Sequence, residues 1–221
     1  MTAKDLINYT IPPLKLSDDI EKAQQWMREF HTREFPVVDG GKYYGVFSED
    51  LIFDDKNDKE KISEYPLLGQ DISVFPQEHY YEILKKSYAQ NLNLVAVVDN
   101  NNRYIGVISI QDVVEAFSKM SSIRSPGAIL VIPMKQIDYS LSEIARIIES
   151  EYGKILSSFI ENHPDDSSMI RLTIKLNVEN AKNIISALER FGFTISSIFG
   201  KEDEDQIEQE RLDTLMKYLK I

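Results

Sequence analysis

The sequence predicts a protein of mixed α and β structure: a duplicated helix–strand–strand–helix unit, then a smaller βαββαβ domain and a C-terminal helix. Three observations indicate this fold class. Residues 35–48 and 95–109 follow nearly the same order of residue types, a break at Ser125-Pro126-Gly127 separates them from a new pattern, and the tail carries an apolar stripe. The expected domains are residues 1–124, residues 125–200 and a helix over residues 201–221.

The first copy of the repeat contains two short apolar runs across a Gly-Gly turn, which is typical of a β-hairpin. Asp39 returns 60 positions later as Asp99. Gly45 returns 61 positions later as Gly106, so the second copy has one extra turn residue. A helical pattern of apolar residues precedes each hairpin and another follows it. The expected bounds are residues 1–58 for repeat one and residues 62–122 for repeat two.

Each repeat is too small to bury one face of its own sheet well. The two repeats are therefore expected to pack together through their strands. The result is a disc with approximate twofold symmetry and a cleft on each side.

The order Pro-Val-Val-Asp, turn, Gly-Val-hydrophobic-Ser and an acidic helix start resembles a cystathionine-beta-synthase-type (CBS) domain pair. The resemblance covers residues 1 to about 120. Members of this family usually bind adenosine nucleotides between the two repeats and regulate an attached or partner protein. The resemblance therefore implies a regulatory protein whose ligand is an adenine nucleotide, in the class of AMP, ATP or S-adenosylmethionine, and which requires no cofactor.

In nucleotide-binding CBS domains, a Ser or Thr followed three positions later by Asp holds the ribose. A carboxylate at a helix start can accept from both ribose hydroxyls, and such charge-assisted hydrogen bonds contribute about 1.5–3 kcal/mol each. The second repeat has this spacing in Ser109 and Asp112. The first repeat has Leu51 three positions after Ser48, with the acid Asp50 one position early. One position turns a helical side chain by about 100°, so we expect a competent cleft at Asp112 and a weaker one at Ser48 and Asp50.

The family's geometry implies that the other repeat completes the Asp112 cleft. The candidate residues are Thr2, Ile7, Thr32 and Arg33. The Arg33 guanidinium is a candidate phosphate ligand. Its counterpart in the second repeat is Asn93, which is assigned to the weaker cleft.

A purely structural interpretation of the same residues stays open. Asp112 is then a first-turn acid that stabilises its helix by about 0.3–1 kcal/mol, Ser109 is an ordinary N-cap, and Arg33 is a solvated surface arginine. Under this alternative the protein's own side chains fill both clefts, and the chain is a ligand-free dimeric scaffold.

The second domain begins after the Ser-Pro-Gly break. Its pattern predicts, in order, a strand over residues 128–133, a helix over 141–151, strands over 154–160 and 169–178, a helix over 180–191 and a strand over 193–199. This βαββαβ order is the split βαβ arrangement of ferredoxin-like folds.

The first helix of this domain opens with Ser-Leu-Ser-Glu-Ile-Ala at residues 140–145, and there the domain resembles an ACT domain, a fold that often binds amino acids at dimer interfaces. The typical motif has Pro-Gly before Ser-Leu, whereas this chain has Asp138 and Tyr139. Without that glycine the backbone cannot be approached as closely, so we expect dimerisation, with an amino-acid sensor as the alternative. A CBS pair followed by an ACT-like domain resembles the acetoin-utilisation regulatory family.

The tail begins with acidic residues and ends with lysines, which suits a helix dipole. Its apolar stripe is expected to dock on the protein's own surface or on a twin subunit.

Composition limits the function further. The formal charge of −11 argues against binding to nucleic acid or to an anionic membrane. Cysteine is absent, and none of the three histidines has a metal-ligand neighbour at helical spacing. We therefore expect a non-enzymatic, cytoplasmic homodimer with no catalytic residues, no metal and an unidentified regulated partner.

Overall fold

The computed structural model describes residues 1–53 and 60–200, which belong to two compact units, Met1–Lys119 and Met120–Ile221. The division falls five residues before the predicted end of the first domain. The predicted C-terminal helix over residues 201–221 lies outside the described residues.

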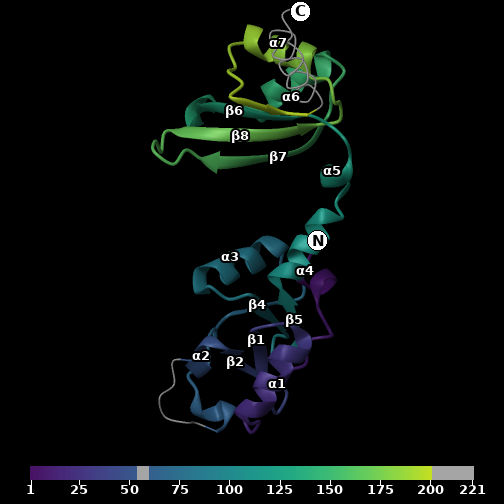
Figure 1. Cartoon of the computed structure of the whole chain (residues 1–221). Helices are drawn as coiled ribbons and strands as arrows, with labels where there is room; N and C mark the ends of the chain where they lie inside the picture. The colour runs from purple at the N-terminus through teal and green to yellow at the C-terminus, as the bar shows by residue number, and fades with distance from the viewer. Residues whose placement is uncertain (54–59, 201–221) are drawn as a thin grey trace, which may run out of the picture. The chain divides into compact units, whose positions relative to one another are not determined.

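The first unit contains the predicted repeat (Figure 1). In the first copy, helix α1 (Ile20–Phe30) leads to the hairpin of β1 (Glu34–Asp39) and β2 (Lys42–Ser48) and then to α2 (Asp50–Phe53). In the second copy, β3 (Ser73–Val74) and α3 (Tyr80–Gln90) lead to the hairpin of β4 (Leu94–Val98) and β5 (Tyr104–Ser109) and then to α4 (Ile110–Ser118). The mixed α and β class and the duplication are confirmed.

The two copies share local backbone geometry as well as element order. His31 and Asn91 end α1 and α3, and both have a left-handed φ of 51°. Each hairpin also has an irregularity in register, between Val37 and Val38 in one copy and between Val97 and Val98 in the other. Each feature in the first copy recurs 60 positions later in the second, so the two copies have the same local backbone conformation at these points.

The N-terminal segments of the two repeats are exchanged. We call residues 1–11 and 60–70 the leading segments; they contain the short 3₁₀ helices η1 (Ala3–Leu6) and η2 (Ile62–Glu64). The first leading segment forms bridges from Thr2 to His79 and from Asn8 to Val107, both in repeat two. The second forms bridges from Lys61 to Asp19 and from Leu68 to Val46, both in repeat one.

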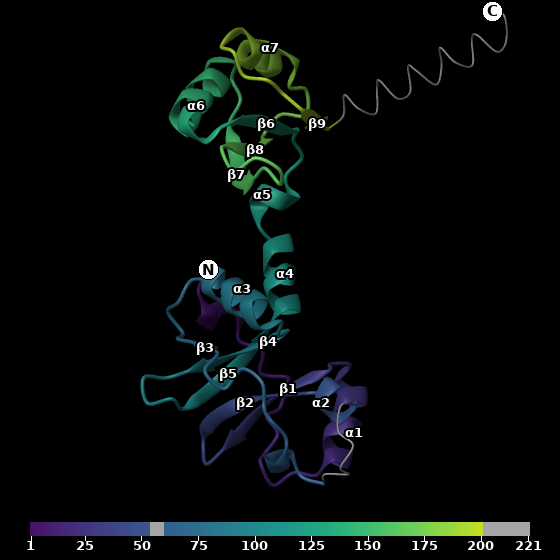
Figure 2. The same cartoon turned by 90° about the vertical axis from the view of Figure 1, so that its left-hand side faces the viewer.

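The apolar cores follow this exchange. Ala3 and Leu6 belong to the same core cluster as Ile83 and Val95 of repeat two. Ile62 and Tyr65 are packed in the core of repeat one. A third cluster joins the hairpins and contains Tyr43, Val46, Leu92, Ala96 and Val98. Since each leading segment completes the core of the other copy, the two repeats form one folding unit; Figure 2 shows β1 and β2 beside β4 and β5.

The second unit contains a four-stranded antiparallel sheet in the order β7-β8-β6-β9. After α5 (Ser121–Arg124), its elements are β6 (Ile129–Lys135), η3 (Gln136–Asp138), α6 (Leu141–Ser150), β7 (Ile155–Asn162), β8 (Met169–Leu176), α7 (Lys182–Arg190) and β9 (Ser197–Phe199). Both helices cover one face of the sheet (Figure 1). Leu130 and Ile132 of β6 point to that face and pack with Ile144 and Leu188 from the helices.

Candidate functional site

Asp112 is held at the start of α4 by a reciprocal capping box. The backbone N–H of Asp112 donates to Ser109 Oγ at 3.0 Å, while Asp112 Oδ2 accepts from the Ser109 backbone N at 2.8 Å and from Ser109 Oγ at 2.6 Å. Such a box satisfies donors that the first turn of a helix leaves unpaired. The capping role is therefore real, and it fixes the carboxylate in one orientation.

The same carboxylate also accepts hydrogen bonds from the side chain of Asn8, a residue of the first leading segment. Asn8 Nδ2 donates to Asp112 Oδ1 at 3.0 Å and to Oδ2 at 3.2 Å. Asn8 is itself held in place, because its Oδ1 accepts from the Thr10 backbone N at 2.8 Å and its backbone N donates to Val107 O at 2.8 Å. Oδ2 thus has three donors, while Oδ1 has one and retains capacity to accept another hydrogen bond.

A cavity of about 680 Å³ lies beside this carboxylate, between the two repeats. Such a volume is typical of small-molecule sites, which are clefts of about 300–1,000 Å³. The lining residues come from the first leading segment, from the turn between α1 and β1 in repeat one, and from the starts of β4 and α4 in repeat two. They are Asn8, Thr10, Ile11, Phe30, His31, Thr32, Arg33, Glu34, Asn93, Leu94, Ser109, Ile110, Gln111, Asp112 and Glu115.

Glu34 is a buried carboxylate in the wall of this cavity and joins the two repeats. It is only 4% exposed. Its Oε2 accepts from the backbone N–H groups of Asn93 at 2.8 Å and Leu94 at 3.0 Å, and its Oε1 accepts from Asn93 Nδ2 at 2.9 Å. Burial raises the pKa of Glu34, while these hydrogen bonds act in the opposite direction. All three partners are donors, so they match the ionised form.

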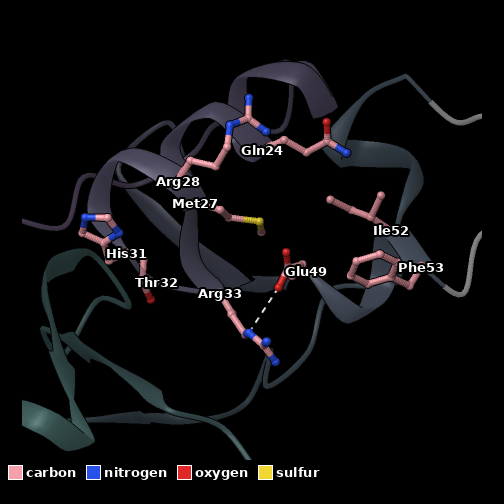
Figure 3. A pocket seen from close by; sticks show the side chains of 9 residues that line it. All are labelled: Gln24, Met27, Arg28, His31, Thr32, Arg33, Glu49, Ile52 and Phe53. Carbon is pink, nitrogen blue, oxygen red and sulfur yellow. Dashed lines mark ion pairs between the residues drawn. The ribbon is translucent and has the colours of Figure 1, made fainter.

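Arg33 lies at the rim of the cavity and is largely exposed. Its Nε is 3.3 Å from Glu49 Oε2, and 79% of its side chain is accessible. Figure 3 shows this ion pair at the edge of a second cavity, of about 510 Å³, which Met27, Ile52 and Phe53 also line. Arg33 therefore belongs to the rims of both cavities, with its charge already partly neutralised.

Comparison with known families settles what the second repeat is. The CBS domain family model matches residues 66–119, which contain β3, α3, β4, β5 and α4. Residues 66–119 form a CBS domain. The first copy has the same helix–strand–strand–helix order at a spacing of 60 residues, so Met1–Lys119 has the architecture of a CBS domain pair, and we call it the CBS pair.

Curated proteins similar to this chain include two uncharacterized archaeal proteins. Uncharacterized protein MJ1232 of Methanocaldococcus jannaschii is 32% identical over 85 residues, a match that covers 38% of this chain and 28% of the relative. Uncharacterized protein MJ0188 of the same organism is 28% identical over 92 residues, or 41% of this chain and 34% of the relative. The chain spans about a third of the length of these relatives.

Solved structures similar to the chain include CBS pairs. A CBS domain pair/ACT domain protein from Thermotoga maritima is 24% identical with a TM-score of 0.47, covering 53% of this chain and 96% of that one. The CBS domain pair of protein MJ0100, in complex with 5′-methylthioadenosine and S-adenosyl-L-methionine, is 22% identical with a TM-score of 0.45, covering 53% and 96%.

The CBS pair brings four of the residues predicted for the Asp112 cleft to the cavity: Ser109, Asp112, Thr32 and Arg33. Thr2 and Ile7 do not line it. The Thr2 backbone N donates to Asp5 Oδ2 at 2.8 Å, and Ile7 packs against Gly106, where an added Cβ would lie 2.4 Å from Ile7 Cγ2. These two residues anchor the leading segment, and the next residue, Asn8, reaches the site.

The residues predicted for the weaker cleft are divided. Ser48 is buried, its Oγ accepts from the Asp50 backbone N at 3.4 Å, and Asp50 is exposed on α2. Asn93 instead lines the cavity at Asp112, where it bonds Glu34. The counterpart of Asn8 in the second leading segment is the apolar Leu68, so the position that caps Asp112 in one cleft offers no side-chain hydrogen bond in the other.

The described part of the chain shows no group of three or more His, Asp or Glu side chains placed to hold a metal ion. Within the same residues, no helix is long and apolar enough to span a bilayer.

Proposed function

We propose that the CBS pair is a regulatory sensor that binds an adenosine-containing small molecule in the cavity at Asp112 and has no catalytic role. The observation that carries this proposal is a carboxylate fixed at a helix start in the wall of a cavity of about 680 Å³ to which both repeats contribute. A ligand that contacts both repeats favours one arrangement of them, and this is how binding alters an equilibrium between states.

The ribose diol is the part of the ligand proposed to meet Asp112. In the ligand-free protein the Asn8 amide donates to both oxygens of Asp112. When the ligand binds, Oδ1 accepts a hydrogen bond from one ribose hydroxyl, and the second hydroxyl takes the place of the Asn8 amide. Charge-assisted hydrogen bonds of this kind contribute about 1.5–3 kcal/mol each. Asn8 therefore acts as a cap on the acid in the ligand-free protein.

Thermal unfolding with and without adenosine compounds tests the proposal. A ligand that binds only the folded state stabilises it by about 2.7 kcal/mol at 100 times its Kd. The panel contains adenosine, AMP, ADP, ATP and S-adenosylmethionine. Asp112→Ala is expected to abolish the shift, and Asp50→Ala, an acid at the start of α2 in the other repeat, serves as the matched control. An unshifted wild type, or an equal shift in Asp112→Ala, contradicts the assignment.

A second candidate is a ligand-free scaffold, and the contacts of Asn8 favour it. Asp112 already accepts from Ser109 and Asn8 within the chain, so its needs for hydrogen bonds are largely met without a ligand. The two candidates differ in the Asn8→Ala variant. A sensor gains affinity when its cap is removed, whereas a scaffold only loses stability.

We further propose that the second unit is an ACT-like domain of ferredoxin-like fold that makes the chain a cytoplasmic homodimer. The sheet order β7-β8-β6-β9 and the βαββαβ succession support this. Tyr139 is partly buried against the core at the position where the ACT motif has glycine, which disfavours amino-acid binding there. Light scattering of the full chain at several concentrations measures the mass, and a monomer at all of them contradicts dimerisation.

A further inference from the structure

The charged side chains that line the Asp112 cavity are mostly acidic. Three carboxylates face it, those of Glu34, Asp112 and Glu115. Arg33 is the single Lys or Arg among the lining residues in the described part of the chain.

The ion pairs around the cavity leave this imbalance unchanged. Arg33 pairs with Glu49 at 3.3 Å, and Glu115 pairs with Lys119 on the outer turn of α4. Within residues 1–53 and 60–200, neither Asp112 nor Glu34 has an ion-pair partner. Their hydrogen bonds come from neutral groups: Ser109 and Asn8 for Asp112, Asn93 and Leu94 for Glu34. The two charges of the wall that no ion pair balances are therefore both negative.

A phosphate chain is poorly suited to this wall. Each phosphate adds negative charge to a cavity whose wall holds two carboxylates without an ion-pair partner, and like charges repel each other in a partly buried site. The dipole at the start of α4 favours an anion, but Asp112 already occupies the first turn of that helix.

On the basis of the proposed function, we infer that the ligand is an adenosine derivative whose 5′ substituent is uncharged or positively charged, and that the cavity discriminates against nucleoside polyphosphates. The ribose diol meets Asp112, and the 5′ substituent lies in the field of Asp112 and Glu34. Selection against phosphate then follows from charge.

Isothermal calorimetry on the full chain tests this inference. The probes are adenosine, 5′-methylthioadenosine, S-adenosylmethionine, AMP, ADP and ATP. The uncharged and cationic compounds are expected to bind most tightly, and affinity is expected to fall about threefold to tenfold with each added phosphate. Raising the salt from about 0.05 M to about 0.5 M screens the repulsion, so it should narrow the gap between adenosine and ADP.

A variant at the rim gives a second test. Glu115→Gln leaves the Lys119 ammonium without its acid, so the affinity ratio of AMP to adenosine is expected to rise about threefold. Glu82→Gln removes an acid paired with Lys85 on α3, away from the cavity lining, and should leave the ratio unchanged.

The outcomes separate this inference from the proposed function. If ATP or ADP binds as tightly as adenosine, the charge inference is overturned while nucleotide sensing stands. The same holds if added salt widens the gap. If no compound in the panel binds, both are overturned.

Discussion

Removing the Asn8 side chain should weaken the fold and strengthen ligand binding at the same time. Asn8 Nδ2 donates to both oxygens of Asp112, at 3.0 and 3.2 Å, in a partly buried setting. A hydrogen bond to a charged group contributes about 1.5–3 kcal/mol. In Asn8→Ala water replaces the amide, so we expect the free energy of unfolding to fall by about 1–2 kcal/mol.

The ligand must displace the amide in the wild type but only water in the variant. In the wild type, binding sacrifices the hydrogen bonds of the amide, whereas the variant has none to lose. If this saves about 1.4 kcal/mol, the affinity of the variant for adenosine is about tenfold higher. Urea unfolding measures the first effect and calorimetry the second. Asn101→Ala, in the exposed turn between β4 and β5, is the control and should change neither. Weaker adenosine binding by Asn8→Ala would refute the reasoning, because Asn8 would then hold the ligand.

Three further predictions concern the fold. Burial raises the pKa of Glu34 above its ordinary value of 4.5. The wild type should therefore lose stability relative to Glu34→Gln as the pH rises from 4.5 through the folded-state pKa. Urea unfolding across this range measures the difference in free energy of unfolding, and a wild type that gains stability relative to Glu34→Gln contradicts the prediction. Gly106→Ala places a methyl group 2.4 Å from Ile7 Cγ2, whereas Gly45→Ala places it 2.7 Å from the Leu68 carbonyl oxygen at a φ of +134°. Both should destabilise the CBS pair by about 1–3 kcal/mol, with Gly45→Ala the more costly because of its backbone conformation, and thermal melts measure the difference. Leu172→Ala, fully buried in the sheet of the second unit, should cost about 2–5 kcal/mol in urea unfolding, and a loss below 1 kcal/mol would contradict its place in the core.

The repeat could be predicted because its signals are local. Each hairpin has its own turn and alternating apolar residues, and these recur as Asp39 and Asp99 at a fixed spacing. The helix starts and the second βαββαβ unit follow from periodicity and breaks in the same way. Element bounds shifted by a few residues, as with β9, which is shorter than the pattern predicted.

The exchange of the leading segments could not be predicted in the same way. The contact of Asn8 with Asp112 joins residues 104 positions apart, and no local pattern specifies it. The one available signal was the alignment of the repeats, which places Asn8 opposite Leu68. A polar residue opposite an apolar one at the same position of a repeat marks where the two clefts differ.

Glu34 and Asn93 show why a comparison of equivalent residues in the two repeats assigned Asn93 to the wrong cleft. Arg33 and Asn93 occupy equivalent positions, so the sequence placed them in different clefts. The starts of β1 and β4 lie side by side, however, and Glu34 reaches across to the backbone of Asn93 and Leu94. Equivalent residues at these two strand starts therefore line one cavity, not two.

The most direct test of the account is calorimetric titration of adenosine into the wild type and into Asp112→Asn. Asparagine keeps an oxygen for the capping box with Ser109 but removes the charge that the ribose diol requires, so the fold should persist while affinity falls. Two charge-assisted hydrogen bonds at about 1.5–3 kcal/mol each predict a loss of at least about a hundredfold when both are lost. Equal affinity in a folded Asp112→Asn protein would show that the carboxylate does not bind the ligand, and the central claim would be wrong.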